Sequence, residues 1–178
     1  MGSDYSDLPP DLPVPEDDGA ADHLPGLPLP SLALPSTSPS GGGENALTLA
    51  MREEVRSQLD LAALAAGRLV AYVYPRTGTP GVPLPEGWDD IPGARGCTPQ
   101  SCAYRDALGE FERLGAGLVG IAAQSAAEQA EFAAREHIPF PLLSDDGLRL
   151  AAALGLPPFE VDGRTLCRRL TFVAAEGR

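Results

Sequence analysis

The chain has 178 residues and a net charge of −12, and its thirteen cationic side chains are all arginine. This length can bury the core of one domain, while a strongly acidic surface lacks the basic footprint that nucleic acids and anionic membranes require. No apolar run approaches the roughly 20 residues that span a bilayer, and no basic and apolar leader opens the sequence, so we expect a cytoplasmic protein. Three cysteines are an odd number, which disfavours a secreted disulfide framework and directs attention to redox or metal chemistry.

An acidic, proline-rich segment occupies residues 1–45, where His23 is the only side chain that could carry a positive charge. Its prolines exclude a long helix, so we expect most of the segment to be extended or mobile. The alternating apolar residues 27–34 can lie against a sheet edge, where proline is tolerated. The sequence therefore predicts a partly mobile extension over residues 1–45, ending in a flexible linker from Ser36, and one domain over residues 46–178.

Helical and strand patterns alternate after the linker. Ser125 and Glu128 form a capping-box pattern, and Asp162-Gly163 is typical of a hairpin turn. This order predicts an α/β fold in which helices flank a mixed sheet that has a hairpin at its edge. In chain order we expect a helix over 47–66, a strand over 68–74, a loop over 75–96, a helix from the Cys97–Pro99 region to Leu114, a strand over 118–122, a helix from Ser125 to Glu136, a strand over 139–143, a helix from Asp145 or Asp146 to Leu154, and a hairpin of 159–161 with 165–175.

Cys97 and Cys102 are the candidates for chemistry. Cys97 falls at the start of a predicted helix, where free amide groups and the positive end of the helix dipole stabilise the nucleophilic thiolate. Cys102 follows five residues later, which on an ideal helix is a rise of about 7.5 Å and a rotation of about 140°. A disulfide needs Cα atoms about 4.4 to 6.8 Å apart, so a Cys97–Cys102 bond requires the first helical turn to unwind.

A zinc site is the other use of paired cysteines. It needs four ligands, and only Cys167, His23 and His137 are available to complete one. Because Cys167 lies in an apolar strand pattern, we expect it to be a small buried core residue. We therefore expect neither a metal nor another cofactor.

Two blocks of the sequence resemble peroxiredoxins of the peroxiredoxin Q, or bacterioferritin-comigratory-protein, type. They are the strand and loop over 72–81 and the segment over 97–106, with its second cysteine five residues after the first. The resemblance extends over about residues 67–177. It implies a thioredoxin-like fold and a thiol peroxidase that reduces hydrogen peroxide or organic hydroperoxides. It also implies a thioredoxin or similar dithiol reductant and a monomer or homodimer.

The resemblance also implies roles for individual residues. Cys97 would be the peroxidatic cysteine and Cys102 the resolving cysteine. Pro75 and Thr79 match the family's proline and threonine, and the threonine bonds to the thiolate and to the peroxide. Arg169 matches a strand arginine whose fixed cation stabilises the thiolate and polarises the O–O bond, as displacement at oxygen requires.

The sequence departs from the family pattern in two places. The family threonine lies three residues before the reactive cysteine, whereas about fifteen additional residues separate Thr79 from Cys97 here, and we expect them to bulge out of the loop. The family fold would also continue with a strand and a helix after residue 177, so we expect an exposed sheet edge. Two alternatives stay open: a thiol–disulfide exchange protein without peroxidase activity, and a redox-inactive thioredoxin-fold module that binds a partner.

Overall fold

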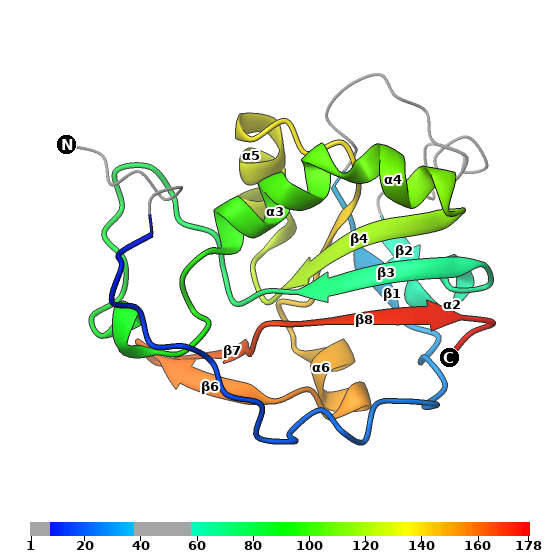
Figure 1. Cartoon of the computed structure of the whole chain (residues 1–178), viewed down its shortest axis with the longest axis horizontal. Helices are drawn as coiled ribbons and strands as arrows, with labels where there is room; N and C mark the ends of the chain where they lie inside the picture. Colours follow the sequence, from blue (N-terminus) through cyan, green and yellow to red (C-terminus); the bar gives the residue numbers. More distant parts are fainter. Residues whose placement is uncertain (1–7, 38–57) are drawn as a thin grey trace.

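The computed structural model describes residues 8–37 and 58–178 (Figure 1). The elements of these residues are, in chain order, β1 (Ala33–Pro35), β2 (Gln58–Asp60), α2 (Leu61–Leu64), β3 (Arg68–Val73), the 3₁₀-helix η1 (Trp88–Asp90), α3 (Cys97–Asp106), α4 (Leu108–Arg113), β4 (Ala116–Ala122), α5 (Ala126–Arg135), β5 (Leu142–Ser144), α6 (Arg149–Leu154), β6 (Pro158–Val161), β7 (Arg164–Cys167) and β8 (Leu170–Ala175).

A mixed sheet with the strand order β5-β4-β3-β8 forms the centre of the described structure. β3 pairs in parallel with β4 and antiparallel with β8, while β4 and β5 are parallel. The helices lie on both sides of this sheet, with α3, α4 and α5 on one side and α6 on the other (Figure 1). The predicted α/β class is therefore confirmed.

The core has two layers because successive side chains of β3 point to opposite faces of the sheet. Leu69 and Val73 belong to one apolar cluster, which α2 and α6 cover. Tyr72 and Tyr74 belong to the other, which includes Phe132 of α5 and is flanked by residues of α3 and α4. A strand buried on both faces explains why the sequence of β3 is a continuous apolar run rather than an alternating one.

The predicted capping box of α5 is confirmed, whereas α6 begins at Arg149 and not at the predicted Asp145 or Asp146. The Ser125 hydroxyl accepts the backbone N–H of Glu128, and the Glu128 carboxylate accepts the backbone N–H of Ser125, which is the predicted capping box of α5. The Asp145 carboxylate still satisfies two amide groups of the first turn of α6, because it accepts the backbone N–H groups of Leu150 and Ala151 at distances of 3.1 and 2.9 Å.

The predicted helix over 47–66 is wrong within the described residues. Residues 47–57 lie outside them, Gln58–Asp60 is a strand, and only Leu61–Leu64 is helical. The strand forms because β1 offers it an antiparallel partner. Asp60 then ends the strand and starts the helix, since its side chain accepts the backbone N–H of Ala63.

Two further predicted elements are each divided in the structure. The helix predicted to end at Leu114 is interrupted at Ala107, which separates α3 from α4. The strand predicted over 165–175 stops after Cys167 and resumes at Leu170, because β7 pairs with β6 whereas β8 pairs with β3. This interruption places Arg168 and Arg169 in a short connection between two sheets.

The proline-rich residues 8–37 contain several turns and one short strand, β1, and they contact the domain at successive points. Asp18 pairs with Arg168 at 2.5 Å, and the His23 imidazole lies 2.9 Å from the carbonyl oxygen of Leu154. Leu34 is buried in the core, and Thr37 exchanges hydrogen bonds with Leu142 at the end of β5. The expectation that residues 27–34 lie near a sheet edge agrees with this path, while the domain boundary at residue 45 stays a prediction.

β8 lies at one end of the central strand order, where Val173 is 65% exposed. The described part of the chain contains no helix that is long and apolar enough to cross a membrane.

Gly120 of β4 lies where two buried side chains approach the backbone. A Cβ atom built there would lie 2.7 Å from the Leu142 side chain and 2.7 Å from the Tyr72 ring. We expect Gly120→Ala to lower the free energy of unfolding by about 1–3 kcal/mol, because the extra methyl group overpacks the core. Chemical denaturation measures this change.

Gly109→Ala is the matched control, because nothing lies within 4 Å of a Cβ at that position in α4. Alanine favours a helix over glycine, so this variant should be as stable as the parent or more stable. Equal stability losses in the two variants would contradict the packing argument.

Candidate active site

Cys97 is the first residue of α3 and only 3% of its surface is exposed. The preceding Gly96 has φ 93°, a left-handed conformation that glycine adopts without steric cost, and this residue turns the loop into the helix. The thiol donates a hydrogen bond of 3.5 Å to the carbonyl oxygen of Ala94. The sulfur is thus held at a helix start, as expected from the sequence, beneath a loop that covers it.

Arg169 reaches Cys97 from the connection between β7 and β8. Its Nη2 atom donates to the Cys97 sulfur at 3.1 Å and to the Arg95 carbonyl at 2.9 Å. Its Nε atom donates to the Gly93 carbonyl at 3.1 Å, and its Nη1 atom donates to the side chain of Gln100. These neutral acceptors fix the guanidinium without neutralising its charge, so the cation remains available to the sulfur.

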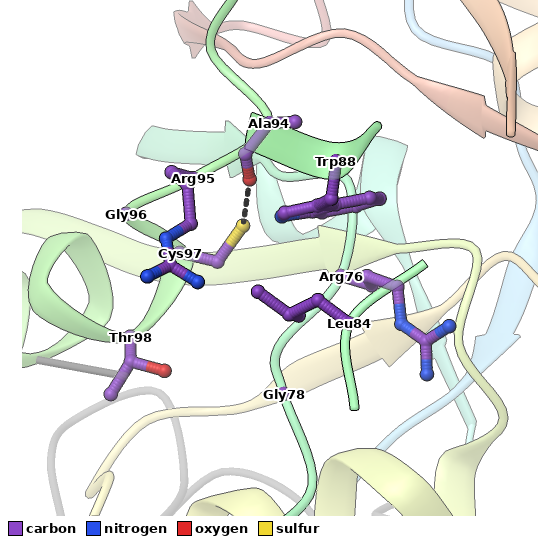
Figure 2. A pocket seen from close by; sticks show the side chains of 9 residues that line it. All are labelled: Arg76, Gly78, Leu84, Trp88, Ala94, Arg95, Gly96, Cys97 and Thr98. Carbon is purple, nitrogen blue, oxygen red and sulfur yellow. Dashed lines mark hydrogen bonds between the residues drawn. The ribbon is translucent and has the colours of Figure 1, made fainter. Parts of the chain in front are cut away.

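A small pocket opens beside the sulfur, with a volume of about 20 Å³. Such a volume accommodates roughly one water-sized molecule. Figure 2 shows the Cys97 sulfur next to the Trp88 ring and Leu84, with its hydrogen bond to Ala94 dashed. The lining residues are Arg76, Gly78, Leu84, Trp88, Ala94, Arg95, Gly96, Cys97 and Thr98.

The residues inserted before Cys97 fold back over the site. Trp88 is 3% exposed and lies with its ring centroid 6.2 Å from that of Phe159 in β6. It shares an apolar cluster with Ala94 and Leu166 of β7. The insertion is therefore anchored on the β6–β7 hairpin. Its residues Leu84 and Trp88 line one side of the pocket, and its last residues lead back to Cys97.

Of the five predicted site residues, only Cys97 is among the residues that line the described pocket; Pro75, Thr79, Cys102 and Arg169 are not. Pro75 is buried directly after the end of β3, and Thr79 is partly buried where the insertion begins. Arg76 and Gly78 are the residues of this segment that line the pocket, and the buried Thr98 lines it from α3. The roles of Pro75 and Thr79 stay predictions.

Gln124 was not expected from the sequence, yet it holds the loop that follows β3. Its Oε1 atom accepts the backbone N–H and the hydroxyl of Thr77 at 2.7 and 3.1 Å, and its Nε2 atom donates to the Thr77 carbonyl at 3.4 Å. Both side chains are buried. Because Thr77 lies between Arg76 and Gly78, this clamp positions one side of the pocket. The only sequence signal for this role was the position of Gln124, a polar residue just after the buried strand predicted over residues 118–122.

Cys102 lies on the same helix as Cys97 but in a different environment. Its thiol donates to the Oε2 atom of Glu136 at a distance of 3.8 Å. Burial raises the pKa of the Cys102 thiol above its ordinary value, the Arg105 cation lowers it, and the Glu136 carboxylate raises it further. While α3 is folded, these surroundings therefore favour the protonated form of the Cys102 thiol.

Cys167 lies in β7 and is buried in the core, as the sequence predicts. Burial, with a smaller contribution from Asp145, raises the pKa of this thiol to about 11. A thiol that stays protonated at neutral pH is a poor nucleophile. Within residues 8–37 and 58–178, no three histidine, cysteine or acidic side chains gather as a metal site would require.

The AhpC/TSA family model matches residues 91–177. Among curated proteins, the chain is 31% identical to the chloroplastic peroxiredoxin Q of Oryza sativa subsp. japonica over 115 residues, which are 65% of this chain and 46% of that protein. It is 29% identical to the chloroplastic peroxiredoxin Q of Populus jackii over 135 residues, which are 71% of this chain and 56% of that protein. The chain spans about half the length of these relatives.

The chain is also similar to solved structures of proteins of this type. Peroxidoxin BcpB from Mycobacterium tuberculosis is 26% identical with a TM-score of 0.60, and the match covers 86% of this chain and 79% of that one. The bacterioferritin comigratory protein of Xanthomonas campestris, in a study of its alkyl peroxide reduction activity, is 26% identical with a TM-score of 0.56, and the match covers 85% and 79% of the two chains. The predicted thioredoxin-like fold and the resemblance to peroxiredoxin Q are confirmed.

The predicted cytoplasmic location is wrong by this comparison, because the curated relatives are chloroplastic proteins. The prediction rested on the lack of a membrane-spanning apolar run and of a secretory leader pattern, and neither feature distinguishes the cytoplasm from an organelle such as the chloroplast.

Gln124→Leu tests the clamp on Thr77. We expect this variant to lose about 1–3 kcal/mol of unfolding free energy, because it leaves the buried backbone N–H and C=O of Thr77 without partners. Thr77→Val removes only the hydroxyl contact and should lose less. Denaturant titration of the two variants measures the difference, and a larger loss in Thr77→Val would refute the assignment.

Proposed function

We propose, from the similarity of the chain to peroxiredoxins, that it is a thiol peroxidase in which Cys97 attacks the peroxide and Cys102 resolves the product. The observation that carries this proposal is the 3.1 Å hydrogen bond from Arg169 to the Cys97 sulfur. A charge-assisted donor at this distance stabilises a thiolate, which is the form of cysteine that attacks.

The pocket geometry supports peroxide as the substrate. In the first step the Cys97 sulfur forms a bond to one peroxide oxygen while the O–O bond breaks. The leaving oxygen takes up a proton and departs as water or an alcohol, and Cys97 becomes a sulfenic acid. The Arg169 cation lies 3.1 Å from the sulfur, and a fixed cation close to the reacting sulfur stabilises the negative charge that develops as the O–O bond breaks.

The small free volume beside the sulfur accommodates about one oxygen atom, the one that Cys97 would attack. We propose hydrogen peroxide or an organic hydroperoxide as the substrate, with any organic substituent extending away from the sulfur. The apolar surfaces of Trp88 and Leu84 help to exclude water from the reaction.

The second step requires α3 to unwind. Several bonds hold its first turns, including the 3.0 Å hydrogen bond from the Tyr72 hydroxyl to Ser101 and the bond between Arg169 and Gln100. Once these break, the Cys102 sulfur attacks the Cys97 sulfenic sulfur, the S–O bond breaks, and water leaves. The resulting disulfide is then reduced by a dithiol such as thioredoxin, which returns the helix to its starting state.

The burial of Cys97 argues against thiol–disulfide exchange as the primary activity. A protein disulfide is too large to reach a sulfur that is 3% exposed and faces a pocket of this size. A redox-inactive module would have no need for a guanidinium held against the sulfur by three further acceptors. The peroxidase is therefore the function that the site supports best.

Cys97→Ser tests the proposal directly. In an assay that couples peroxide consumption to a dithiol donor, we expect this variant to lose activity by a factor on the order of 10³ or more, because it removes the nucleophile. Cys167→Ser is the control and should retain activity, since that thiol is buried away from the pocket. Full peroxide consumption by Cys97→Ser would refute the proposal.

The resolving role of Cys102 is tested in the unsubstituted protein. Mass spectrometry after one equivalent of peroxide should detect a Cys97–Cys102 disulfide.

Arg169→Met tests the contribution of the cation. A hydrogen bond to a charged group contributes about 1.5–3 kcal/mol, so kcat/KM for peroxide should fall roughly 10- to 100-fold. Arg168→Met is the matched control, because Arg168 pairs with Asp18 at an exposed position and such pairs contribute little. Equal rates for the two variants would show that the cation at the sulfur is not used.

A further inference from the structure

We propose that Glu136 controls the resolving step: its carboxylate holds Cys102 as a protonated thiol within folded α3 and delays disulfide formation until the helix unwinds. The inference rests on the proposed peroxidase function and adds a positioning residue to it. Glu136 acts through Cys102 and does not touch the peroxide.

The contact joins two helices that are distant in the sequence. Glu136 ends α5, and its Oε2 atom lies 3.8 Å from the sulfur of Cys102 in the middle of α3. A thiol donates to an ionised carboxylate, which has only acceptor atoms. The glutamate therefore stabilises the S–H form and gives the thiolate no donor.

The carboxylate is also prevented from turning away. Its other oxygen, Oε1, pairs with Nη1 of Arg135 at 2.6 Å, and its side chain is 21% exposed. The backbone carbonyl of Glu136 accepts Nη1 of Arg105 at 2.6 Å. One oxygen is thus occupied by Arg135, and the other is directed to Cys102.

The charged groups around Cys102 come from both helices. Arg105 and Asp106 lie on α3, and Arg135 and Glu136 lie at the end of α5. Arg105 is the cation that favours a Cys102 thiolate, but its Nε atom is 2.9 Å from the Asp106 carboxylate and its Nη1 atom bonds to Glu136. Both acidic side chains raise the pKa of the thiol, in the same direction as its burial.

The two cysteines of α3 therefore face opposite electrostatic partners. Cys97 faces a guanidinium donor, which suits a nucleophile that must be ready before the peroxide arrives. Cys102 faces a carboxylate acceptor, which suits a group that must stay unreactive until a sulfenic acid has formed. When α3 unwinds, Cys102 leaves Glu136 and gains solvent, so its proton is released and its sulfur attacks.

Atoms balance in this sequence. The S–S bond forms as the S–O bond of the sulfenic acid breaks, and the released hydroxide combines with the proton from Cys102 to give water. No reagent other than the peroxide that oxidised Cys97 is required.

Glu136→Gln is the test, with Glu131→Gln as its matched control. Glu131 is also an acid of α5 that pairs with Arg135, at 2.9 Å, but it is 48% exposed and makes no hydrogen bond to Cys102. Each variant removes one charge and one partner of Arg135. Only Glu136→Gln removes the charge beside the Cys102 sulfur.

The first measurement is the rate of Cys102 alkylation by iodoacetamide against pH, in chains that also carry Cys97→Ser and Cys167→Ser. We expect Glu136→Gln to move the profile to lower pH and to raise the rate at pH 7.5 at least about threefold, while Glu131→Gln matches the parent. Identical profiles for the two variants would overturn the proposal.

The second measurement is rapid-quench mass spectrometry after one equivalent of peroxide, with both cysteines of α3 present. Glu136→Gln should form the Cys97–Cys102 disulfide faster and consume peroxide at the parent rate. A slower disulfide step would mean that Glu136 promotes resolution as a base, which would overturn the proposal. If the parent itself forms no sulfenic acid with peroxide, the peroxidase proposal fails, and the alkylation profile still decides the role of Glu136.

Discussion

The hydrogen bond between the Arg169 guanidinium and the Cys97 sulfur is the constraint on which the architecture of the site depends. It brings together a helix start and a strand connection that are 72 residues apart in the chain. Arg169 occupies this position because the strand predicted over 165–175 is interrupted, with one part pairing to β6 and the other to β3. The carbonyls of Gly93 and Arg95 then fix the guanidinium from the loop that leads into α3.

The insertion before Cys97 is compatible with the contact between Arg169 and Cys97 because it packs against the rest of the domain. Trp88 packs on Phe159 of the β6–β7 hairpin, the same hairpin whose end leads into Arg169. One structural unit therefore supports both the loop and the arginine. The insertion also contributes Leu84, Trp88 and Ala94 to the lining of the pocket.

A single helix carries both cysteines, and tertiary contacts make them chemically different. The Cys97 sulfur lies at the helix start and accepts a hydrogen bond from the fixed cation of Arg169. Cys102, one and a half turns later, is partly buried against the carboxylate of Glu136. Since the two sulfurs point in different directions on an intact helix, a Cys97–Cys102 disulfide requires a conformational change, and the bonds that hold α3 set the free-energy cost of that change.

The sequence by itself determined the α/β class, β3 and β4, the capping box of α5 and the placement of Cys97 at a helix start, because these depend on local hydrophobic patterns and capping chemistry. It also named Arg169, but only through a family resemblance. Tertiary structure alone decided the strand at Gln58–Asp60, the interruption at Arg168 and the contacts of Gln124 and Glu136. Each of these depends on a partner far away in the chain, and neither propensity nor periodicity encodes which distant segment will supply a hydrogen bond or a charge.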